Sequence, residues 1–434
     1  MGRKIRVFII LFLIIISGGI IVYNRINMNN EKKNGNTKTK IKKEIIQGDG
    51  DYKIKLLKAV NSSEKNNYLI SPYSIRIALN MLADGADAET KREILNLVGN
   101  DGPIITPIKG RLNVANALFL KDKYEKYINK DFIKDLENEY DANVLVDEFK
   151  TPKVINDWVN EKTYKIIPVL LNNIPERFVL GLANSIALDV EWDTTFDCYA
   201  THKAAFTKID NTSMDVSMMS NSYKYGIQYF IQKDYQGVIL PYTSYNKDGK
   251  KDYKADSHFE FIGIMPNNSN IKDFISNLPS DFLDTFDDDV SEVSNKNVID
   301  LYLPVFSYDY DLANFKDILK DLGIKKAFNP NKAEFYNIIT KENREKYSID
   351  NIYVDEAIHK THIELNESGT KAAAVTYFGM LETASFEKEE PKVIEIKFNK
   401  PFLYLIRDSK SKEILFLGTV YEPNKFKENT CDEK

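Results

Sequence analysis

The order of helical and strand-like patterns along the chain constrains its fold more than any other feature of the sequence. Between residues 51 and 165, apolar residues recur mainly at helical spacing, and Ser71-Pro72 supplies a helix start, with serine as the cap and proline in the first turn. From Phe178 onward, short apolar runs typical of strands predominate. Because helices and strands do not alternate, we predict an α+β fold with mostly antiparallel sheets. We expect helices near residues 71–82, 88–98, 124–140, 152–165 and 312–322, and strands near residues 178–192, 237–242, 259–265, 298–306, 354–365, 393–398, 402–407 and 414–420.

The size and composition of the chain indicate a packed globular body. A chain of 434 residues with 43% hydrophobic residues can bury one large core or two ordinary ones. No stretch within residues 51–423 resembles a linker, so we expect one domain there and a polar C-terminal tail over 424–434. The two cysteines, Cys198 and Cys431, are too few for a framework of disulfides, and four histidines leave little material for a zinc cluster. We therefore expect stability to come from packing, with no metal and no cofactor.

The formal net charge of −5 is unevenly distributed along the chain. Counting from the sequence, residues 1–6 carry three basic side chains, residues 24–50 carry seven against three acidic ones, and residues 51–434 therefore carry a net charge of −12. An acidic body repels phosphate groups, and the sequence shows no basic stripe with interleaved aromatic residues. We do not expect nucleic acid to be a partner.

The N-terminus carries an apolar segment of 17 residues, from Val7 to Tyr23, directly behind three basic residues. We interpret residues 1–23 as a signal peptide or an N-terminal membrane anchor. The small residues Ser17-Gly18-Gly19 could mark a cleavage site, whereas the apolar continuation Ile20-Ile21-Val22 slightly favours an uncleaved anchor. Residues 24–50 are typical of a flexible basic linker, although their lysines weaken the charge-based argument for orientation. We expect an extracellular protein, secreted or tethered to the outer face of the cell membrane.

The segment between residues 366 and 392 fits neither a strand pattern nor an ordinary loop. It spans 27 residues, whereas connections longer than about 12–15 residues within a compact domain are usually functional or disordered. Its first half contains few charges, and no proline interrupts it before Pro391. This half could therefore form a strand if a place in a sheet became available.

The sequence lacks the motifs of common catalytic sites. It contains no Gly-x-Ser-x-Gly elbow, no His-Glu-x-x-His helix, no phosphate-binding loop and no dinucleotide fingerprint. His359 and His362 stand three apart in a strand-like run and should point to opposite faces, which makes them a poor metal pair. Cys198 has no catalytic motif around it, and burial explains it as well as reactivity does. We do not expect an enzyme.

Several separated motifs give the chain from about Asp51 to Pro423 a resemblance to the serpin family. In chain order they are Ile70-Ser71-Pro72-Tyr73-Ser74-Ile75, Val114-Ala115-Asn116-Ala117-Leu118-Phe119, Asn156-Asp157-Trp158-Val159-Asn160, Leu182-Ala183-Asn184-Ser185-Ile186 with Trp192 and Phe196, Leu303-Pro304 with Phe306, His359-Lys360, Glu367-Ser368-Gly369-Thr370, Phe398-Asn399-Lys400-Pro401-Phe402 and Gly418-Thr419-Val420. The resemblance implies a serpin fold of three mostly antiparallel β-sheets with eight or nine helices. It also implies a metastable native state and an exposed reactive-centre loop over about residues 367–392. We expect a bacterial member with an N-terminal signal or anchor.

The residues after Glu367 have the composition of a loop that can enter a sheet. The family's hinge corresponds to Glu367, Ser368, Gly369, Thr370, Ala372, Ala373, Ala374 and Thr376. In a strand, small or apolar residues from Thr370 to Met380 would share the inward face, whereas Lys371 would face solvent. About 15 new backbone pairs at roughly 1 kcal/mol each would release on the order of 10 kcal/mol. Insertion of this loop is therefore physically feasible.

The resemblance implies suicide inhibition of serine proteases by a monomeric protein. The protease would cut the loop as an acyl-enzyme and be trapped in a covalent complex when the loop inserts. Counting along the family pattern places the reactive bond at Thr383-Ala384. The stretch before Phe398 is longer than usual, so cleavage at Met380, Leu381, Glu382 or Phe386 stays open, as does a papain-like cysteine protease target. The alternative is a non-inhibitory serpin that acts as a binding or structural protein, and the small hinge residues speak against it.

The resemblance also suggests a polar cluster that holds the strands together until the loop enters. Its members would be Ser71, Ser74, Asn184 and His359, although ordinary buried polar groups would look the same. Two departures from the family pattern concern this region. Many members carry a lysine after the Leu-Pro motif to pair with the hinge glutamate, but Val305 stands here, so either insertion is easier or another cation pairs with Glu367. The polar segment from Thr243 to His258 is longer than expected.

Overall fold

The computed structural model describes residues 48–255, 258–292, 297–370 and 391–428. The apolar segment 7–23, most of the basic linker, the loop from 371 to 390 and Cys431 lie outside the described residues. The described residues all belong to one compact unit, Ile46–Lys434. Within these ranges, no helix combines the length and the apolar character needed to cross a membrane.

Nine α-helices and four short 3-10 helices occur in the described ranges. The α-helices are α2 (Tyr52–Ser63), α3 (Pro72–Gly85), α4 (Ala88–Val98), α5 (Lys130–Tyr140), α6 (Lys153–Lys162), α7 (Ile271–Ser276), α8 (Phe282–Thr285), α9 (Phe315–Asp321) and α10 (Lys341–Tyr347), and the 3-10 helices are η1 (Asp122–Tyr127), η2 (Cys198–Ala200), η3 (Phe286–Asp289) and η4 (Lys326–Phe328). The predicted cap of α3 is present, because the Ser71 hydroxyl accepts a hydrogen bond from the Ser74 N–H at 3.1 Å. The helix expected over 124–140 is divided into η1 and α5, since Ile128 and Asn129 between them are extended.

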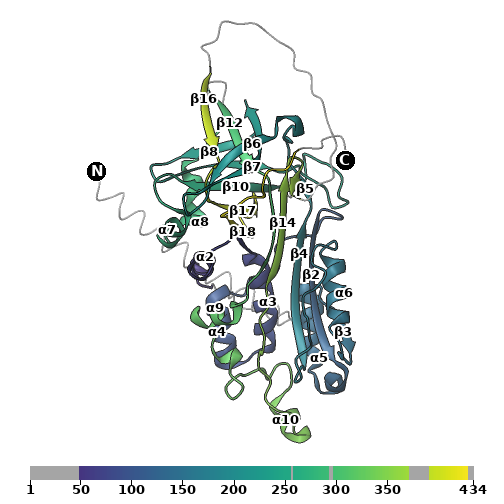
Figure 1. Cartoon of the computed structure of the whole chain (residues 1–434). Helices are drawn as coiled ribbons and strands as arrows, with labels where there is room; N and C mark the ends of the chain where they lie inside the picture. The colour runs from purple at the N-terminus through teal and green to yellow at the C-terminus, as the bar shows by residue number, and fades with distance from the viewer. Residues whose placement is uncertain (1–47, 256–257, 293–296, 371–390, 429–434) are drawn as a thin grey trace, which may run out of the picture. The chain divides into compact units, whose positions relative to one another are not determined.

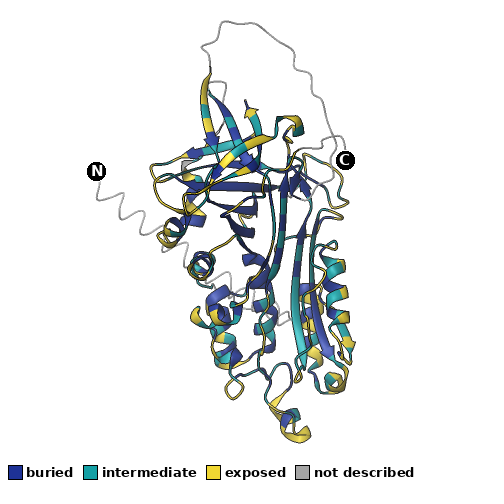
Figure 2. Cartoon of the chain, viewed as in Figure 1, coloured by how far each residue is buried: buried dark blue, intermediate teal, exposed yellow. Residues whose placement is uncertain are grey.

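The largest sheet has seven strands and forms the centre of the hydrophobic core. Its order is β1 (Tyr68–Ile70), β18 (Ile414–Val420), β17 (Phe402–Asp408), β10 (Phe259–Pro266), β9 (Tyr235–Pro241), β8 (Gln228–Ile231) and β11 (Ser291–Glu292), and each neighbouring pair is antiparallel. Every residue of β10, β17 and β18 is buried, as the dark ribbons of Figure 2 show. These strands lie where the continuous apolar runs of the sequence predict them.

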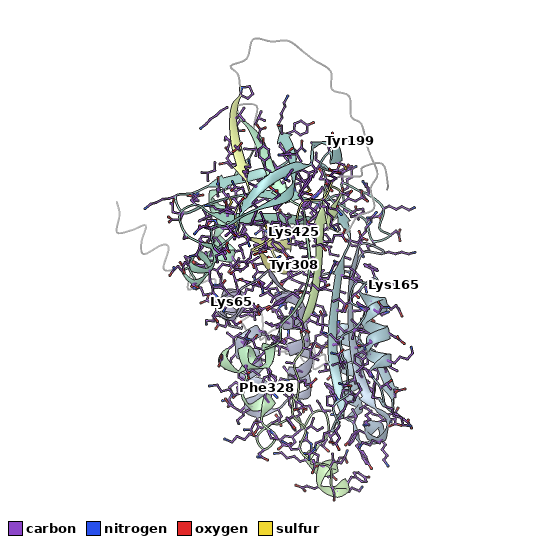
Figure 3. The ribbon with its side chains drawn as sticks, in the orientation of Figure 1. Lys65, Lys165, Tyr199, Tyr308, Phe328 and Lys425 are labelled. Atoms are coloured by element: carbon purple, nitrogen blue, oxygen red, sulfur yellow. The ribbon has the colours of Figure 1, made fainter. Side chains whose placement is uncertain are left out.

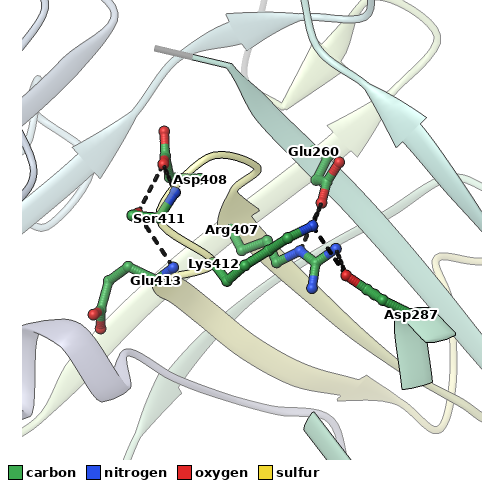
Figure 4. Close-up of polar contacts among 7 residues, drawn as sticks. All are labelled: Glu260, Asp287, Arg407, Asp408, Ser411, Lys412 and Glu413. Carbon is green, nitrogen blue, oxygen red and sulfur yellow. Dashed lines mark hydrogen bonds and ion pairs between the residues drawn. The ribbon is translucent and has the colours of Figure 1, made fainter. Parts of the chain in front are cut away.

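A buried ion cluster fastens η3 to this sheet (Figure 4). Arg407 of β17 is 3% exposed, and its Nε donates to a carboxylate oxygen of Glu260 in β10 at 2.6 Å. Its second guanidinium branch contacts Asp287 of η3 at 2.5 Å, and Lys412 reaches the same oxygen at 3.0 Å. Two cations therefore balance two carboxylates, which offsets the cost of burying Arg407 and Glu260, while Lys412 stays exposed to solvent.

A second sheet has four strands, and the chain enters it at Lys392, after residues 371–390. Its order is β16 (Lys392–Lys397), β12 (Asn297–Pro304), β7 (Ser213–Tyr223) and β6 (His202–Thr207). The pair of β16 and β12 is parallel, and the other two pairs are antiparallel. Residues 371–390 thus connect this sheet to the central one.

The central sheet is divided into two blocks. One block orders β3 (Asn143–Asp147), β2 (Leu112–Lys121) and β4 (Leu180–Leu188), and the other orders β13 (Phe306–Asp311), β14 (Lys360–Asn366), β15 (Gly369–Thr370) and β5 (Val190–Glu191). Only Asp189 separates β4 from β5, so the blocks meet at this point in the chain. The described residues thus form four hydrogen-bonded sheets instead of the expected three, because β14 and β4 run beside each other without pairing (Figure 1).

Helices cover the two faces of the divided sheet. Helix α6 packs on β2 and β4, where Trp158 and Ile155 form a small core of their own with Phe119 and Phe149. Helix α3 packs against β4 and β18, so it lies between the central sheet and the seven-stranded sheet. The α+β prediction is confirmed, and the chain has the layered arrangement that large antiparallel sheets require.

Candidate functional site

The hinge begins inside the central sheet. Gly369 and Thr370, which form β15, pair with Asn366 and Leu365 of β14 on one side. On the other side they pair with Glu191 and Val190 of β5. The first two residues of the predicted inserting strand therefore already occupy the middle position at one end of the sheet.

Glycine is needed at position 369 because the neighbouring backbone is too close for a side chain. A Cβ atom on Gly369 would lie 2.2 Å from the carbonyl oxygen of Val190, and the φ angle there is +151°. The tight approach lets β15 pair with β5 directly after the reversal at Glu367 and Ser368. The Ser368 N–H stabilises that reversal by donating to the Asn366 side chain at 3.0 Å.

Thr370 is buried and hydrogen-bonded to Tyr242, which directly follows β9 of the seven-stranded sheet. Its side-chain oxygen lies 2.6 Å from the Tyr242 hydroxyl, and the residue is 6% exposed. The Tyr242 ring stacks on Trp192, with centroids 4.6 Å apart, and burial raises the pKa of Tyr242 above its ordinary value. Tyr242 therefore stays neutral and provides a fixed hydroxyl for the hinge.

Glu367 is held by a turn rather than by a cation. The Thr201 hydroxyl donates to the Glu367 carboxylate at 2.9 Å, and the Phe196 N–H donates to the Glu367 carbonyl oxygen at 2.9 Å. Among the described residues, the side-chain contact of the Glu367 carboxylate is this Thr201 hydroxyl, and no ion pair joins it to a Lys, Arg or His. The Thr201 hydroxyl thus makes the contact with Glu367 that the family pattern assigns to a lysine at position 305.

The four residues of the predicted polar cluster lie together in two hydrogen-bonded pairs. The Ser71 N–H donates to His359 Nε2 at 3.0 Å, and the Ser74 hydroxyl donates to the Asn184 side-chain oxygen. Asn116, which the sequence analysis missed, accepts from the Asn184 amide at 2.8 Å. Asn116 and Asn184 stand opposite each other in the pairing of β2 with β4. The cluster therefore extends from α3 across two strands.

His359 is neutral, because burial without a charged partner lowers its pKa to about 4. Its Nε2 accepts a hydrogen bond, which assigns the ring proton to Nδ1. His362, three residues on, lies against Asp309 at 2.7 Å on the other side of the strand. The two histidines thus contact different partners, as their spacing predicts.

A cavity of about 980 Å³ separates the two blocks of the central sheet. Its walls are β4 and the segment 347–363, and Ile75 and Leu79 of α3 contribute to its lining. Thr370 also lines it, so the hinge lies at the edge of this space. The strand expected from residue 354 begins only at Lys360, because residues 351–359 border the cavity and pair with no strand in the described part of the chain.

The long polar segment after Thr243 lies beside the hinge. Tyr245 and Lys251 form a β-bridge, and Lys251 Nζ lies 2.7 Å from the Glu191 carboxylate. Arg111 lies 3.2 Å from the same carboxylate, and its guanidinium covers the Tyr245 ring at 4.4 Å. The segment therefore braces β5, the strand that pairs with Gly369.

The remaining sequence predictions concern the loop residues after Thr370 and the state of Cys198. Ala372, Ala373, Ala374, Thr376, Thr383 and Ala384 lie outside the described residues, so the structure does not test them. Cys198, interpreted as buried or reactive, is instead disulfide-bonded. A cysteine in a disulfide is neither a nucleophile nor a metal ligand in that state.

The described residues place a short paired strand, Gly369–Thr370, at the edge of a cavity that divides the central sheet. The serpin family model, described as serpin (serine protease inhibitor), matches residues 47–423. The chain belongs to the serpin family.

Relatives span nearly the whole domain. Serpin-Z10 of Arabidopsis thaliana is 28% identical over 412 residues, which cover 88% of this chain and 98% of that protein. An uncharacterized serpin-like protein of Methanosarcina acetivorans is 28% identical over 83% of this chain and 82% of its own. The crystal structure of the thermophilic serpin tengpin in its native state is similar with a TM-score of 0.70 and 29% identity, covering 89% of this chain and 96% of that one.

Proposed function

We propose that this serpin is an irreversible, suicide-substrate inhibitor of serine proteases. Membership of the family supports protease inhibition in general. The observation that carries the finer proposal is the hinge: Gly369 and Thr370 are seated in the sheet, and Thr370 borders a cavity that continues between β4 and β14. A cleaved loop attached to Thr370 has a continuous path into that cavity.

The proposed reaction starts at the bond between Thr383 and Ala384. The protease's nucleophilic serine attacks the Thr383 carbonyl carbon, an acyl-enzyme forms, and Ala384 leaves as the new N-terminus. Residues from 371 onward then add to β15 as a strand between β14 and β4, with Ala372, Ala374 and Thr376 facing inward. Ladder bonds worth on the order of 10 kcal/mol drive this step, which must be faster than hydrolysis of the ester.

The polar cluster and the turn at Glu367 have proposed roles in the same step. Ser71 and Ser74 join α3 to both walls of the cavity, through His359 and Asn184 respectively, and so oppose its widening. Opening the sheet requires these bonds to rearrange. Papain-like cysteine proteases are a second proposed target, because their thioester would be trapped in the same way.

We further propose that the protein acts outside the cell as a monomer, secreted or held at the membrane by residues 7–23. The disulfide at Cys198 supports an oxidising compartment. The basic linker over 24–50 would then separate the serpin domain from the membrane.

The test is incubation of the full-length protein with a panel of serine and papain-like cysteine proteases. An inhibitor gives a complex that survives boiling in detergent. After reduction of disulfides in the denatured sample, the mass of the released fragment identifies the cut, with residues 384–434 expected. A non-inhibitory serpin would be cleaved or ignored without forming such a complex. That outcome against every protease of the panel would favour the binding or structural alternative.

The substitution Thr370→Arg provides a sharper version of this test. It places a charge at a position that is already buried beside Tyr242 in the native structure. We therefore expect the arginine to leave the sheet in the intact protein, and its return during insertion of the cleaved loop to cost several kcal/mol. We expect this variant to be cut as a substrate, with at least a tenfold loss in the fraction of complex. Thr370→Ser is the matched control, because it keeps the hydroxyl and should still trap. Undiminished trapping by Thr370→Arg would show that this side chain does not face inward during insertion.

A further inference from the structure

Cys198 sits in the turn that holds the hinge glutamate. The Phe196 N–H and the Thr201 hydroxyl both donate to Glu367, each at 2.9 Å. Cys198 lies between these two donors, in η2, and is disulfide-bonded. Both ends of this turn are thus fastened to Glu367, and its middle carries a covalent cross-link.

The C-terminal tail lies on the strands that follow the same turn. Lys425 forms a β-bridge with Val216 of β7, and the Phe426 N–H donates to the Asp215 carbonyl oxygen at 2.9 Å. On β6, Lys203 Nζ lies 5.9 Å from the centroid of the Phe426 ring. Figure 3 labels Lys425 of the tail and Tyr199 of the turn. The tail therefore lies on the sheet formed by β16, β12, β7 and β6. Its contacts are close to the start of β6 at His202, directly after the turn that contains Cys198.

The sequence contains two cysteines, so within one chain Cys198 can pair only with Cys431. Cys431 stands three residues beyond Glu428, the last described residue, and three residues span up to about 10 Å. Lys203, which contacts the tail, is five residues from Cys198. We propose that a Cys198–Cys431 disulfide straps the C-terminal tail to the hinge-holding turn, and that reduction of this bond loosens the hinge.

The redox step requires a dithiol as the reductant. One dithiol thiolate attacks a sulfur of the disulfide, and the other cysteine leaves as a thiolate that takes up a proton. The second dithiol thiolate then resolves the mixed disulfide. Two electrons and two protons pass to Cys198 and Cys431, and the dithiol becomes a cyclic disulfide.

The hinge is a suitable target for such control because β15 is short. It has two residues, and its position depends on its ladder bonds, on Tyr242 and on the turn at Glu367. Elements with so few contacts open locally at low free-energy cost. Releasing the tail from the turn removes one restraint on Glu367, so the hinge should open more often.

Peptide mapping of the full-length protein under non-reducing conditions tests the pairing. We expect a cross-linked pair of peptides containing Cys198 and Cys431 that separates on reduction. Free thiols at both positions, or a covalent dimer on a non-reducing gel, would overturn the strap.

Amide hydrogen exchange tests the coupling to the hinge. We compare the oxidised protein with the reduced protein and with Cys431→Ser. Peptides covering 192–201 and 366–370 should exchange at least fivefold faster in both altered forms, while β10 and β17 should not change. The double variant Cys198→Ser with Cys431→Ser is the control, since reductant should have no effect on it. Equal exchange in the oxidised and reduced wild-type protein would contradict the coupling. Neither experiment uses a protease, so the result does not depend on the proposed inhibition.

Discussion

Tyr242 supplies the hydroxyl that bonds Thr370, the second residue of β15. Its bond to Thr370 is 2.6 Å long, and the stacked Trp192 ring fixes its direction. Tyr242→Phe removes this bond but keeps the stack, and it leaves the buried Thr370 hydroxyl without this partner, at a cost of about 1–3 kcal/mol. We expect faster amide exchange at Gly369 and Thr370 and a higher fraction of protease turned over as substrate.

The matched control is Tyr404→Phe, which deletes a buried hydroxyl bonded to Tyr308 at 2.7 Å in the seven-stranded sheet. It should lower the free energy of unfolding by a similar amount and leave the hinge amides unchanged. If both variants affected the hinge equally, the role of Tyr242 would be general stability rather than seating of Thr370.

His359 makes the stability of the protein depend on pH. Burial lowers its pKa in the folded state to about 4, against 6.5 in the unfolded chain. Above pH 6.5 neither state binds the proton. As the pH falls from 6.5 towards 4, the unfolded chain is protonated first, so folded stability is lost over this window, by roughly 3 kcal/mol in total.

Urea unfolding of the wild type and of His359→Asn at pH 7, 5.5 and 4.5 measures this contribution. Carboxylates titrate in both proteins, so the difference between the two slopes isolates the histidine. We expect the wild type to lose stability more steeply than the variant. Parallel slopes would mean that His359 is not held neutral in the folded protein.

Helix α3 is the element that joins the two walls of the cavity. Its N-terminal residues bond to the segment before β14 through His359 and to β4 through Asn184. Asn184→Ala removes the second link and also leaves the amide oxygen of Asn116 without the bond it accepts from Asn184. We expect the free energy of unfolding to fall by about 1–3 kcal/mol and β4 to separate from α3 more readily.

Readier separation should appear as faster spontaneous loop insertion. Incubation at an elevated temperature below the unfolding midpoint should convert Asn184→Ala to a more heat-stable form several times faster than the wild type. Asn267→Ala is the control, because Asn267 donates to Gln232 at 2.8 Å, in the turn that follows β10 and away from the cavity. A conversion rate like that of the control would show that this bond does not limit opening.

Local signals in the sequence predicted the elements that depend on nearby residues. The Ser71-Pro72 cap predicted α3, and continuous apolar runs predicted β10, β17 and β18. The hydrogen bond between Thr201 and Glu367 joins positions 166 residues apart, and that between Tyr242 and Thr370 joins positions 128 apart. No periodic pattern marks such contacts, and a family pattern pointed to a lysine instead.

The division of the central sheet was missed for a different reason. Val354 to Leu365 has the composition of one strand, yet only Lys360–Asn366 is paired. A strand forms where a neighbour is available, and the place beside residues 351–359 is open. Sequence periodicity reports what a segment can form, and under the proposed function the inserted loop would be the neighbour that completes this strand.

At the scale of the whole molecule, the proposed insertion of residues 371–390 as an additional strand of the central sheet makes a thermal prediction. Inserting the cut loop would add ladder bonds worth on the order of 10 kcal/mol without changing the rest of the fold. With an unfolding entropy of about 2.1 cal/mol/K per residue, a domain of this size should then melt about 10 °C higher or more. Calorimetry before and after a single cut within residues 376–390 measures the shift in Tm. Thr370→Arg, cut in the same way, is the control and should gain much less, since its charge opposes entry next to Tyr242. If the cut wild type melted no higher than the intact protein, the loop would not be an unused strand, and the open sheet would need another explanation.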